Sequence, residues 1–423
     1  MKKLFLCLLP VFVLLISCEP ESKIQNSFSS ETDTLLIHTT KIKGTGVFQP
    51  GTLPLRARDT SEYYIVEIIL PTGIDSIRRL EYSVDFVRNY YFAYKGGQEN
   101  LRKYIEEDVE HNYIDTSLCL PESESLYNII EGYLDGNKIF IVDENNNKDL
   151  TDDSIRRIED IETDNPDDFV EFRYNVYDGK EFVSERSWLG FRYQDNLIWW
   201  GKKEHTIAEF TIDEKSYKIA IGRPHAFDFV YDFESTAPYL LAFVPLNDNE
   251  VEYEESEYLQ LGQYMILDSQ YYCLQNLSRD GKELTLVKED DFQNQTGIQV
   301  GLKAPEFNCI TIDGDSVHSI DLKDKGIIIV NMCGCGGDYE SVKAYDDILS
   351  EFGKEYHVLG VDSQFFDYTE GVLIDSGDLY NEEFYKNYRQ MYCSRKTYVI
   401  DKDFRIASIF NSIEWQAFLE KSN

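Results

Sequence analysis

Between Thr34 and about Gln295, short runs in which apolar and polar residues alternate are separated by turn residues. Examples of these runs are Tyr63 to Leu70, Lys138 to Val142, Phe169 to Val176 and Tyr217 to Ile221. Alternation with a period of two, together with many Tyr and Phe residues, is typical of half-buried strands. Asp-Gly pairs follow several of the runs, and this dipeptide favours tight hairpins. The pattern predicts an antiparallel, β-rich region over residues 34–298.

Two segments of this region have apolar residues at helical spacing instead. Asn100 to Val109 places four of them on one helical face, and Ser125 to Tyr133 does so less regularly. We therefore expect two helical interruptions. The acidic stretch Glu159 to Asp168 marks a candidate boundary near 160–168, so the region forms either one large unit or two smaller domains.

From residue 301 the pattern changes to alternating strands and helices. A first hairpin is expected at Cys309 to Ile312 and Val317 to Leu322, and Ile327 to Met332 is an apolar run, as in a strand buried on both faces. An amphipathic helix follows, with Asp338 as its N-cap. The order after it is a strand at Tyr356 to Val361, a helix at Asn381 to Gln390, strands at Thr397 to Asp401 and Phe404 to Phe410, and a last helix at Ser412 to Glu420. This order predicts a mixed sheet with helices on both faces over residues 299–423.

The first residues have the composition of an export signal. Lys2 and Lys3 precede an apolar run from Leu4 to Ile16, which is about as long as a signal-peptide core and too short to cross a bilayer. Residues 15–18 read Leu-Ile-Ser-Cys, and this resembles the lipobox of bacterial lipoproteins. The resemblance implies that residues 1–17 are removed and that Cys18 carries lipid. An ordinary signal peptide with a chance cysteine is the alternative.

A polar stretch follows Cys18. Residues 18–33 show no hydrophobic period and are expected to form a tether of at most ~50 Å between the membrane and the first strand. The expected location is therefore outside the cytoplasm, anchored to a bacterial envelope membrane on its periplasmic or outer face.

Charge narrows the choice of partners. The 423 residues include 77 acidic and 41 basic side chains, a net charge of −36, and loss of the two leader lysines would make it −38. Such a chain repels phosphate backbones and anionic lipid headgroups, which excludes nucleic-acid binding. Hydrophobic residues make up 42% of the chain, enough to build sizeable cores.

One loop of the β-rich region has oxygen ligands at alternate positions. Asp143, Asn145, Asn147 and Asp149, with Asp153 further on, follow the odd positions of a calcium loop. The glycine and the closing glutamate of an EF-hand are missing. Two interpretations are open: a Ca²⁺ ion that stiffens this loop, or a solvated acidic turn.

The C-terminal segments resemble a known family. They are similar to the redoxin branch of the thioredoxin superfamily. The similarity lies in residues 304–307 (Ala-Pro-Glu-Phe), the hairpin with Asp313-Gly314 at its turn, the strand–cysteine–helix unit from 327 to 352 and residues 397–401 (Thr-Tyr-Val-Ile-Asp). That branch includes exported thiol-disulfide oxidoreductases and peroxiredoxins of the AhpC-TSA type. The resemblance covers about the last 120 residues and implies an α/β thioredoxin-like domain.

The chemistry that the resemblance implies lies at residues 332–338, Met-Cys-Gly-Cys-Gly-Gly-Asp. A helix N-terminus stabilises a thiolate, and the thiolate is the species that attacks a disulfide. Cys333 and Cys335 would attack and resolve, Arg395 would help to stabilise the thiolate, and Cys393 is a candidate third thiol. The spacing is Cys-Gly-Cys where the family has Cys-x-x-Cys, and Arg395 stands where thioredoxins have a cis-proline.

Three functional interpretations follow. In the first, the chain exchanges disulfides with exported proteins or with a redox partner. In the second, it is a non-catalytic envelope binding protein with a degenerate thioredoxin-like domain. The third is a soft-metal site for Zn²⁺ or Cu⁺, formed by Cys333, Cys335 and Cys393. The first needs no cofactor.

Overall fold

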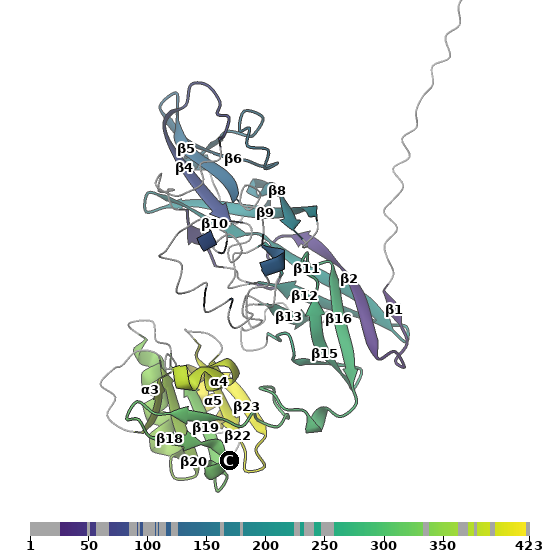
Figure 1. The fold of residues 1–423 in the computed structure, drawn as a ribbon, viewed down its shortest axis with the longest axis vertical. Helices are drawn as coiled ribbons and strands as arrows, with labels where there is room; N and C mark the ends of the chain where they lie inside the picture. Colours follow the sequence, from purple (N-terminus) through teal and green to yellow (C-terminus); the bar gives the residue numbers. More distant parts are fainter. Residues whose placement is uncertain are drawn as a thin grey trace, which may run out of the picture.

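The protein is described by a computed structural model. It describes residues 26–48, 51–55, 67–83, 116–119, 126–160, 165–177, 181–223, 229–231, 241–246, 258–332, 338–362, 371–375, 379–389 and 394–419, with single helical positions at 91, 94, 95, 106 and 109. Figure 1 shows a β-rich region joined through the segment after β16 to a smaller body of mixed strands and helices.

The largest sheet of the β-rich region has the strand order β13-β12-β11-β2-β16-β15-β14, and β1 pairs with β11. Its strands are antiparallel to their neighbours except for β1. The bounds are β1 Ser27–Phe28, β2 Thr34–Lys43, β11 Glu204–Ile212, β12 Lys215–Gly222, β13 Ala242–Pro245, β14 Tyr264–Leu267, β15 Gln270–Leu277 and β16 Glu283–Glu289.

Strand β2 joins the two halves of this sheet. Its first half, from Thr34 to His38, pairs with β16, and its second half, from Thr39 to Lys43, pairs with β11. Leu35 and Ile37 alternate with exposed neighbours and are fully buried in a core shared by both halves. The sheet is therefore held by one long strand whose apolar residues have a period of two.

Two four-stranded antiparallel sheets complete the β-rich region. One has the order β3-β10-β9-β8, with bounds Leu53–Pro54, Leu197–Lys202, Phe182–Gln194 and Val170–Tyr177. The other has the order β4-β5-β6-β7, with bounds Asp75–Ser83, Leu126–Leu134, Asn137–Val142 and Arg156–Arg157. A common core, to which Phe140 and Trp200 belong, joins these two sheets.

The prediction of a helix at Ser125 to Tyr133 is wrong, because its described residues, from Leu126 on, belong to strand β5. Ile129 packs into the common core, while its neighbour Ile130 packs with Ile139 and Leu150 on the opposite face. Both faces are covered, so apolar residues do not alternate strictly with polar ones along the strand, and the period-two signal that separates a strand from a helix is lost. Of the second predicted helix, only positions 106 and 109 are described, and both are helical.

The β5–β6 hairpin forms where the sequence predicts it. Asp135 and Gly136 connect the strands, with φ values of 51° and 79°. Two successive positive φ values match the twist of a two-residue hairpin, and glycine takes the second of them without steric cost.

The C-terminal sheet is mixed, as predicted, with the order β21-β20-β19-β22-β23. Strands β19, β20 and β21 are parallel, whereas β22 and β23 run antiparallel to their neighbours. The bounds are β19 Gly326–Asn331, β20 Tyr356–Asp362, β21 Val372–Asp375, β22 Lys396–Ile400 and β23 Ile406–Asn411. The edge strand β21 is not among the predicted strands.

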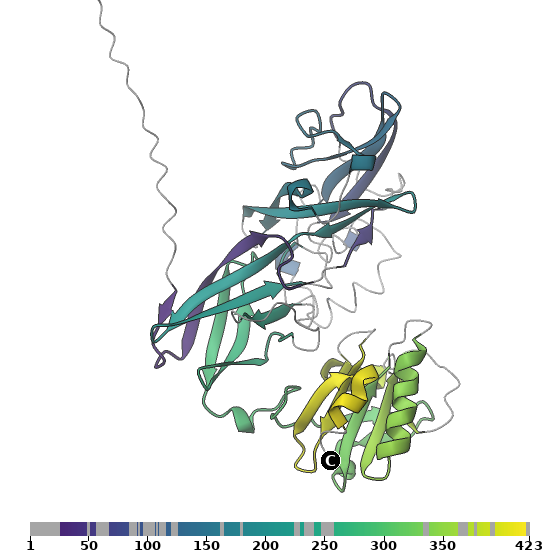
Figure 2. The same cartoon turned by 180° about the vertical axis from the view of Figure 1, so that it is seen from behind.

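Alternate residues of β19 face two different cores. Ile328 and Val330 pack with the helices α3 (Tyr339–Phe352) and α5 (Trp415–Leu419), whereas Ile327 and Ile329 pack with the opposite layer. That layer contains α4 (Glu382–Phe384) and the π-helix Tyr385–Arg389 that continues it. Figure 2 shows α3 against the sheet from behind. Helices therefore cover both faces of β19, and every one of its residues is buried.

The first hairpin of this domain is shorter than predicted. Strands β17 (Asn308–Ile310) and β18 (Ser316–His318) pair, but the chain then turns into a 3₁₀-helix over Ser319–Leu322. The prediction of a strand to Leu322 is therefore wrong for its second half. Ser319 is buried, and its hydroxyl accepts a hydrogen bond from the Phe307 amide at 2.9 Å, which holds the tight turn. The other 3₁₀-helices within the described ranges are Thr116–Leu118, Ile158–Asp160, Pro166–Asp168, Phe292–Asn294, Leu379–Asn381 and Ser412–Glu414.

The segment between β16 and the C-terminal domain is packed on both sides. Phe292 stacks on Tyr271 with ring centroids 3.9 Å apart, and the Gln299 amide exchanges two hydrogen bonds with the Tyr264 main chain, at 2.6 and 2.8 Å. On the other side, Arg405 donates to the carbonyls of Gln293 and Gly301 at 2.7 and 2.9 Å. The connection is thus held by specific contacts and not by chain continuity alone.

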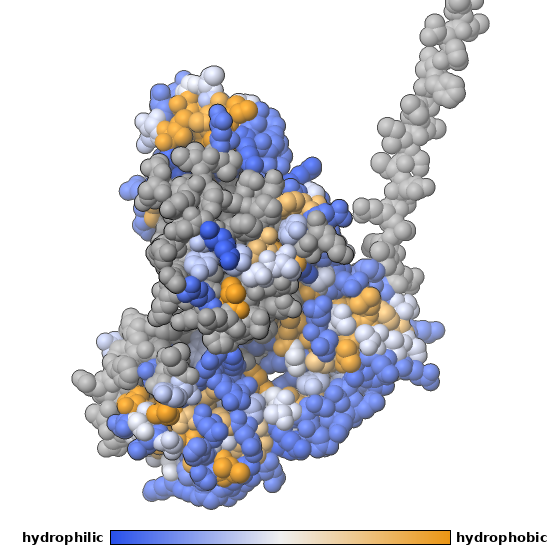
Figure 3. All heavy atoms as spheres, in the orientation of Figure 1, coloured by the Kyte–Doolittle hydropathy of each residue, from blue (hydrophilic) through white to orange (hydrophobic). Residues whose placement is uncertain are grey.

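Hydrophilic side chains cover much of the face in Figure 3, and apolar ones occur in scattered groups. One apolar group lies at the end of the molecule that β4, β5 and β6 form. Ile77 and Tyr133, in β4 and β5, are each 42% exposed.

Candidate functional site at the start of helix α3

The candidate site lies between the end of β19 and the start of α3. Asn331 ends the strand, Met332 is fully buried, and Asp338 caps the helix. The predicted residues Cys333 and Cys335 come between Met332 and Asp338 in the chain and lie outside the described residues. Cys393 also lies outside the described residues.

The helix begins where the sequence predicts it. The Asp338 carboxylate accepts a hydrogen bond from the Ser341 amide at 3.4 Å, as an N-cap side chain does. Ala344, Tyr345 and Ile348 then form the buried stripe that fixes the helix on the sheet. The N-terminal amides of the helix, and the positive end of its dipole, are therefore at Asp338, the residue that follows the segment 333–337 in the chain.

Arg395 binds the cap residue. Its Nε donates to Asp338 Oδ2 and its Nη2 to Asp338 Oδ1, each at 2.8 Å, which makes a bidentate pair. The Asp338 side chain is 6% exposed and that of Arg395 is 33% exposed. Burial opposes the ionised form, but hydrogen bonds from Ser341 and Arg395 lower the pKa of the Asp338 carboxyl below its usual range. The guanidinium predicted to stabilise a thiolate is thus bound to a carboxylate.

A layer of buried polar side chains holds the end of β19 in place. The Asn331 amide donates to the carbonyls of Tyr388 and Lys396, at 2.7 and 2.6 Å. The guanidinium of Arg389 donates from Nη1 to the carbonyls of Met332 and Val361, at 2.7 and 3.1 Å. Asn331 and Arg389 are both fully buried. These contacts fix the end of β19 relative to β20, β22 and the π-helix.

Sequence reasoning did not identify this layer. Asn331 interrupts the apolar run Ile327 to Met332, and a polar residue inside such a run is the one signal that could have indicated a buried hydrogen-bonding role. Nothing in the local pattern around Arg389 distinguishes it from the neighbouring exposed basic residues.

Cys309 does not belong to the site. It lies on β17, packs in the core with Phe307 and Phe384, and burial raises the pKa of its thiol to about 12. Cys273, on β15, is half-buried, and burial raises the pKa of its thiol as well. Both are free thiols in protonated form near neutral pH.

The predicted calcium loop connects β6 to the segment before β7 and is closed by hydrogen bonds of its own. Asp143 is fully buried, and its carboxylate accepts from the amides of Asn147 and Lys148 at 3.0 Å each. The side chains of Asn145 and Asn147 each donate to Asp152, at 3.2 and 3.0 Å. Within the part of the chain that the structure describes, no three His, Cys, Asp or Glu side chains are grouped as metal ligands. Calcium binding by this loop stays a prediction.

Two further residues of that loop complete its description. Asp149 accepts from the amide and the hydroxyl of Thr151, and Asp153 accepts from the Glu144 amide at 3.0 Å. Burial raises the pKa of the Asp153 carboxyl to about 6, and the neighbouring carboxylates Asp143 and Asp152 add to the increase.

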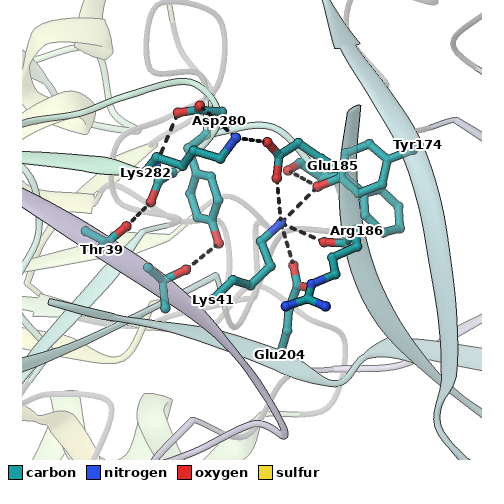
Figure 4. A network of polar contacts seen from close by, with 12 residues as sticks. Thr39, Lys41, Tyr174, Glu185, Arg186, Glu204, Asp280 and Lys282 are labelled. Atoms are coloured by element: carbon teal, nitrogen blue, oxygen red, sulfur yellow. Dashed lines mark hydrogen bonds and ion pairs between the residues drawn. The ribbon is translucent and has the colours of Figure 1, made fainter. Parts of the chain in front are cut away.

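A second buried polar cluster lies in the β-rich region, around the ammonium of Lys41 (Figure 4). The Nζ atom donates to the Arg186 carbonyl at 2.9 Å and to the Tyr174 hydroxyl at 3.2 Å. The carboxylates of Glu185 and Glu204 lie 3.9 Å from it, and their side chains are 8% and 4% exposed. Because the cluster joins β2, β8, β9 and β11, it ties the largest sheet to the β8–β9 sheet. No sequence motif indicated it.

Trp199 and Trp200, in the middle of β10, lie in different surroundings. Trp200 is buried in the common core, whereas Trp199 is half-buried and lies under the Arg192 guanidinium, 5.1 Å from the ring centroid.

No helix in the described ranges is both long enough and apolar enough to cross a membrane. The predicted signal segment and Cys18 lie outside those ranges.

Comparison with known proteins gives likenesses to solved structures alone. No family model matches the chain, and no curated protein matches it. The thioredoxin domain of a thiol-disulfide oxidoreductase from Bacteroides vulgatus is 17% identical; the match covers 30% of this chain and 100% of that one, with a TM-score of 0.23.

Two other solved structures show a similar degree of likeness. The exposed lipoprotein thioredoxin Etrx1 of Streptococcus pneumoniae is 19% identical over 27% of this chain and 99% of its own, with a TM-score of 0.23. A reduced 2-Cys peroxiredoxin of Plasmodium vivax is 14% identical over 26% of this chain and 71% of its own, with a TM-score of 0.23. At such low identities and TM-scores, these likenesses do not establish what the chain does.

Proposed function

We propose that residues 299–423 form a thioredoxin-like domain that exchanges disulfides through Cys333 and Cys335. The observation that carries the proposal is the position of this thiol pair in the chain, between the end of the buried strand β19 and the capped N-terminus of α3. Amides and the helix dipole at such a position favour the thiolate over the thiol.

The reaction starts with loss of a proton from one of the two thiols. The resulting thiolate attacks one sulfur of a substrate disulfide; a protein–substrate S–S bond forms, and the substrate S–S bond breaks. The departing substrate sulfur takes up a proton. The second thiol then loses its proton and attacks the mixed disulfide, which releases the other substrate sulfur as a thiol. The substrate is reduced by two electrons, and the protein pair is oxidised to a disulfide; the reverse sequence oxidises a dithiol substrate.

We further propose that the chain is an envelope lipoprotein attached through Cys18, and that its substrates are disulfides of exported proteins or of a redox partner. The lipobox resemblance and the polar tether support this location, and disulfides persist in that compartment. Cys18→Ala should move the protein from the detergent phase to the aqueous phase in a phase-partition experiment. A wild-type protein that already partitions into the aqueous phase would reject the anchor.

Alkylation of the full chain with and without prior reduction, followed by peptide mass spectrometry, tests the thiol pair. We expect Cys333 and Cys335 to become alkylated only after reduction of the oxidised protein, and we expect Cys333→Ser to abolish turnover of a model disulfide such as insulin. Cys273→Ser is the matched control, because it removes a half-buried thiol on β15 and should leave turnover unchanged.

Other outcomes would favour the remaining interpretations. If no reversible bridge forms and Cys333→Ser turns over insulin as the wild type does, the domain is an inert interaction module. Zinc or copper that survives dialysis of the wild type but is lost from Cys393→Ser would indicate the soft-metal site.

A further inference from the structure

Residues 292–304 form the joint between the β-rich region and the C-terminal domain, and they are attached to the two parts in different ways (Figure 1). Toward the C-terminal domain the attachment is a main-chain ladder. The Gly301 amide donates to the Ile406 carbonyl at 2.9 Å, and the Ile406 amide donates to the Leu302 carbonyl at 3.0 Å. The joint thus extends the C-terminal sheet beyond its edge strand β23.

Side chains strengthen this first attachment. The guanidinium of Arg405 spans the joint, because its Nη1 donates to the carbonyls of both Gln293 and Gly301. Ile298 packs against the C-terminal core, and Leu302 is 2% exposed. The joint is therefore built into the C-terminal domain.

Toward the β-rich region the joint contributes the side chain of Gln299. It lies at β14, the edge strand of the largest sheet, where its Oε1 accepts from the Tyr264 amide at 2.8 Å and its Nε2 donates to the Tyr264 carbonyl at 2.6 Å. A residue of an antiparallel strand exchanges its amide and carbonyl bonds with one opposite residue. The Gln299 side chain therefore takes the place of a neighbouring strand.

Phe292 makes the second contact with this sheet. Its ring stacks on Tyr271 of β15, with centroids 3.9 Å apart and 5° between the ring planes, and meets Tyr264 edge-on at 5.2 Å. Phe292 is 7% exposed, so moving it away from the sheet would return an aromatic side chain to water.

We propose that Gln299 and Phe292 form a latch that holds the C-terminal domain against the edge of the largest sheet, so that the two parts of the chain keep one relative orientation. With the latch closed, the domain cannot turn without breaking two hydrogen bonds and separating a stacked ring pair. With the latch open, the joint stays with the C-terminal domain, and the exposed residues Asp290 and Asp291 become the hinge. The inference goes beyond the proposed function and involves no thiol.

The distance between two spin labels measures this orientation in the full chain. Nitroxides attached to p-acetylphenylalanine at Asn276 in β15 and at Tyr339 in α3 leave the cysteines unlabelled, and both positions are exposed. We expect double electron–electron resonance to give a single narrow distribution of distances in the protein with an intact latch.

Two substitutions open the latch in different ways. Gln299→Glu keeps the size of the side chain but removes the donor to the Tyr264 carbonyl and places a charged oxygen against it, whereas Phe292→Ala removes the stacked ring. In each variant we expect the distance distribution to broaden by at least about twofold. Gln275→Ala is the matched control, because it removes an exposed glutamine from the same sheet and should leave the width unchanged.

Chymotrypsin gives an independent measurement, because it cleaves after Phe292, which the closed latch buries. Cleavage of the full chain at this bond, followed by mass spectrometry of the fragments, should be about tenfold faster in Gln299→Glu than in the wild type. Gln275→Ala should be cleaved at the wild-type rate.

Thermal melting shows whether each variant is folded, and if Phe292→Ala does not fold, Gln299→Glu alone decides. A broad distribution in the protein with an intact latch would overturn the inference. Folded latch variants with the narrow distribution and the slow cleavage of the wild type would overturn it as well. Neither readout requires disulfide exchange, so a failure of the proposed function leaves this result unaffected.

Discussion

Arg389 donates a hydrogen bond to the carbonyl of Met332 across 2.7 Å, although the two residues are 57 positions apart in the sequence. The contact binds a fully buried guanidinium to the main chain of the residue that precedes Cys333 in the sequence. It joins the π-helix to the end of β19, so the position of the strand end depends on a side chain from a distant segment.

Replacing this arginine should destabilise the domain. Arg389→Met removes the donor to two buried carbonyls, and an unsatisfied buried polar group is costly, so we expect the free energy of unfolding to fall by about 3 kcal/mol. Urea denaturation measures the change. Arg173→Met on β8 is the control, because that side chain is 67% exposed and its loss should change stability by less than ~0.5 kcal/mol. Equal effects of the two substitutions would refute the structural role of Arg389.

The buried cluster around Lys41 gives a second stability prediction. Lys41→Met leaves the nearly buried carboxylate of Glu204 without its cation, whereas Glu185 keeps its ion pair with Lys282, and we expect a loss of about 3 kcal/mol. Adding Glu204→Gln should restore part of the loss, because one uncompensated charge is then removed. Chemical denaturation of the single and double variants tests this, and a double variant less stable than Lys41→Met would contradict it.

The same cluster predicts a pH dependence. Burial alone would lower the pKa of Lys41, but the Tyr174 phenol and the Glu204 carboxylate raise it well above its usual range. A raised lysine pKa contributes stability that is complete below the unfolded value of 10.5 and is lost as the pH rises toward the folded value. The stability difference between wild type and Lys41→Met should therefore be constant through neutral pH and narrow only above pH 10.5.

The Cys309 thiol should be almost inert. Its pKa is raised from 9.0 to about 12 by burial, so at pH 8 the native protein contains roughly 1,000-fold less Cys309 thiolate than the unfolded chain. We expect the rate at which iodoacetamide modifies Cys309 to be at least about 1,000-fold lower in the native protein than in the urea-unfolded chain. Rapid native labelling of Cys309 would show that β17 does not hold it in the core.

Asp153 should reduce stability at neutral pH. Its carboxyl has a pKa raised to about 6, mainly by burial, so the folded state loses stability as the pH rises from the unfolded value of 3.8 through 6. Asp153→Asn keeps an oxygen for the Glu144 amide and removes the charge, so its melting temperature should exceed that of the wild type at pH 7 and equal it below pH 3.8. A variant that melts lower at pH 7 would refute this.

Calcium binding by this loop can be tested with the wild type and Asp153→Asn. If the loop takes Ca²⁺ as the sequence pattern predicts, about 1 mM CaCl₂ should raise the melting temperature of the wild type and should raise that of Asp153→Asn less. MgCl₂ at the same concentration controls for ionic strength. Equal shifts with the two salts would leave the loop as an acidic turn.

The sequence by itself determined the elements whose signals are local. The apolar run of β19, the N-cap Asp338 and the Asp135-Gly136 turn were readable because strand period, helix capping and hairpin geometry depend on neighbours in the chain. The segment of β5 was misread because a strand buried on both faces loses its period, and only its pairing with β4 and β6 identifies it.

Tertiary structure alone decided which polar groups from distant parts of the sequence bind each other. Asp338 and Arg395, Arg389 and Met332, and Lys41 and Glu204 are each separated by more than 50 residues, and no pattern near either partner indicates the other. Such pairs exist because packing brings polar groups into surroundings where an unpaired charge or hydrogen bond would be costly. The position of the thiol pair in the chain could thus be predicted, whereas the ion pair at the start of α3 could not.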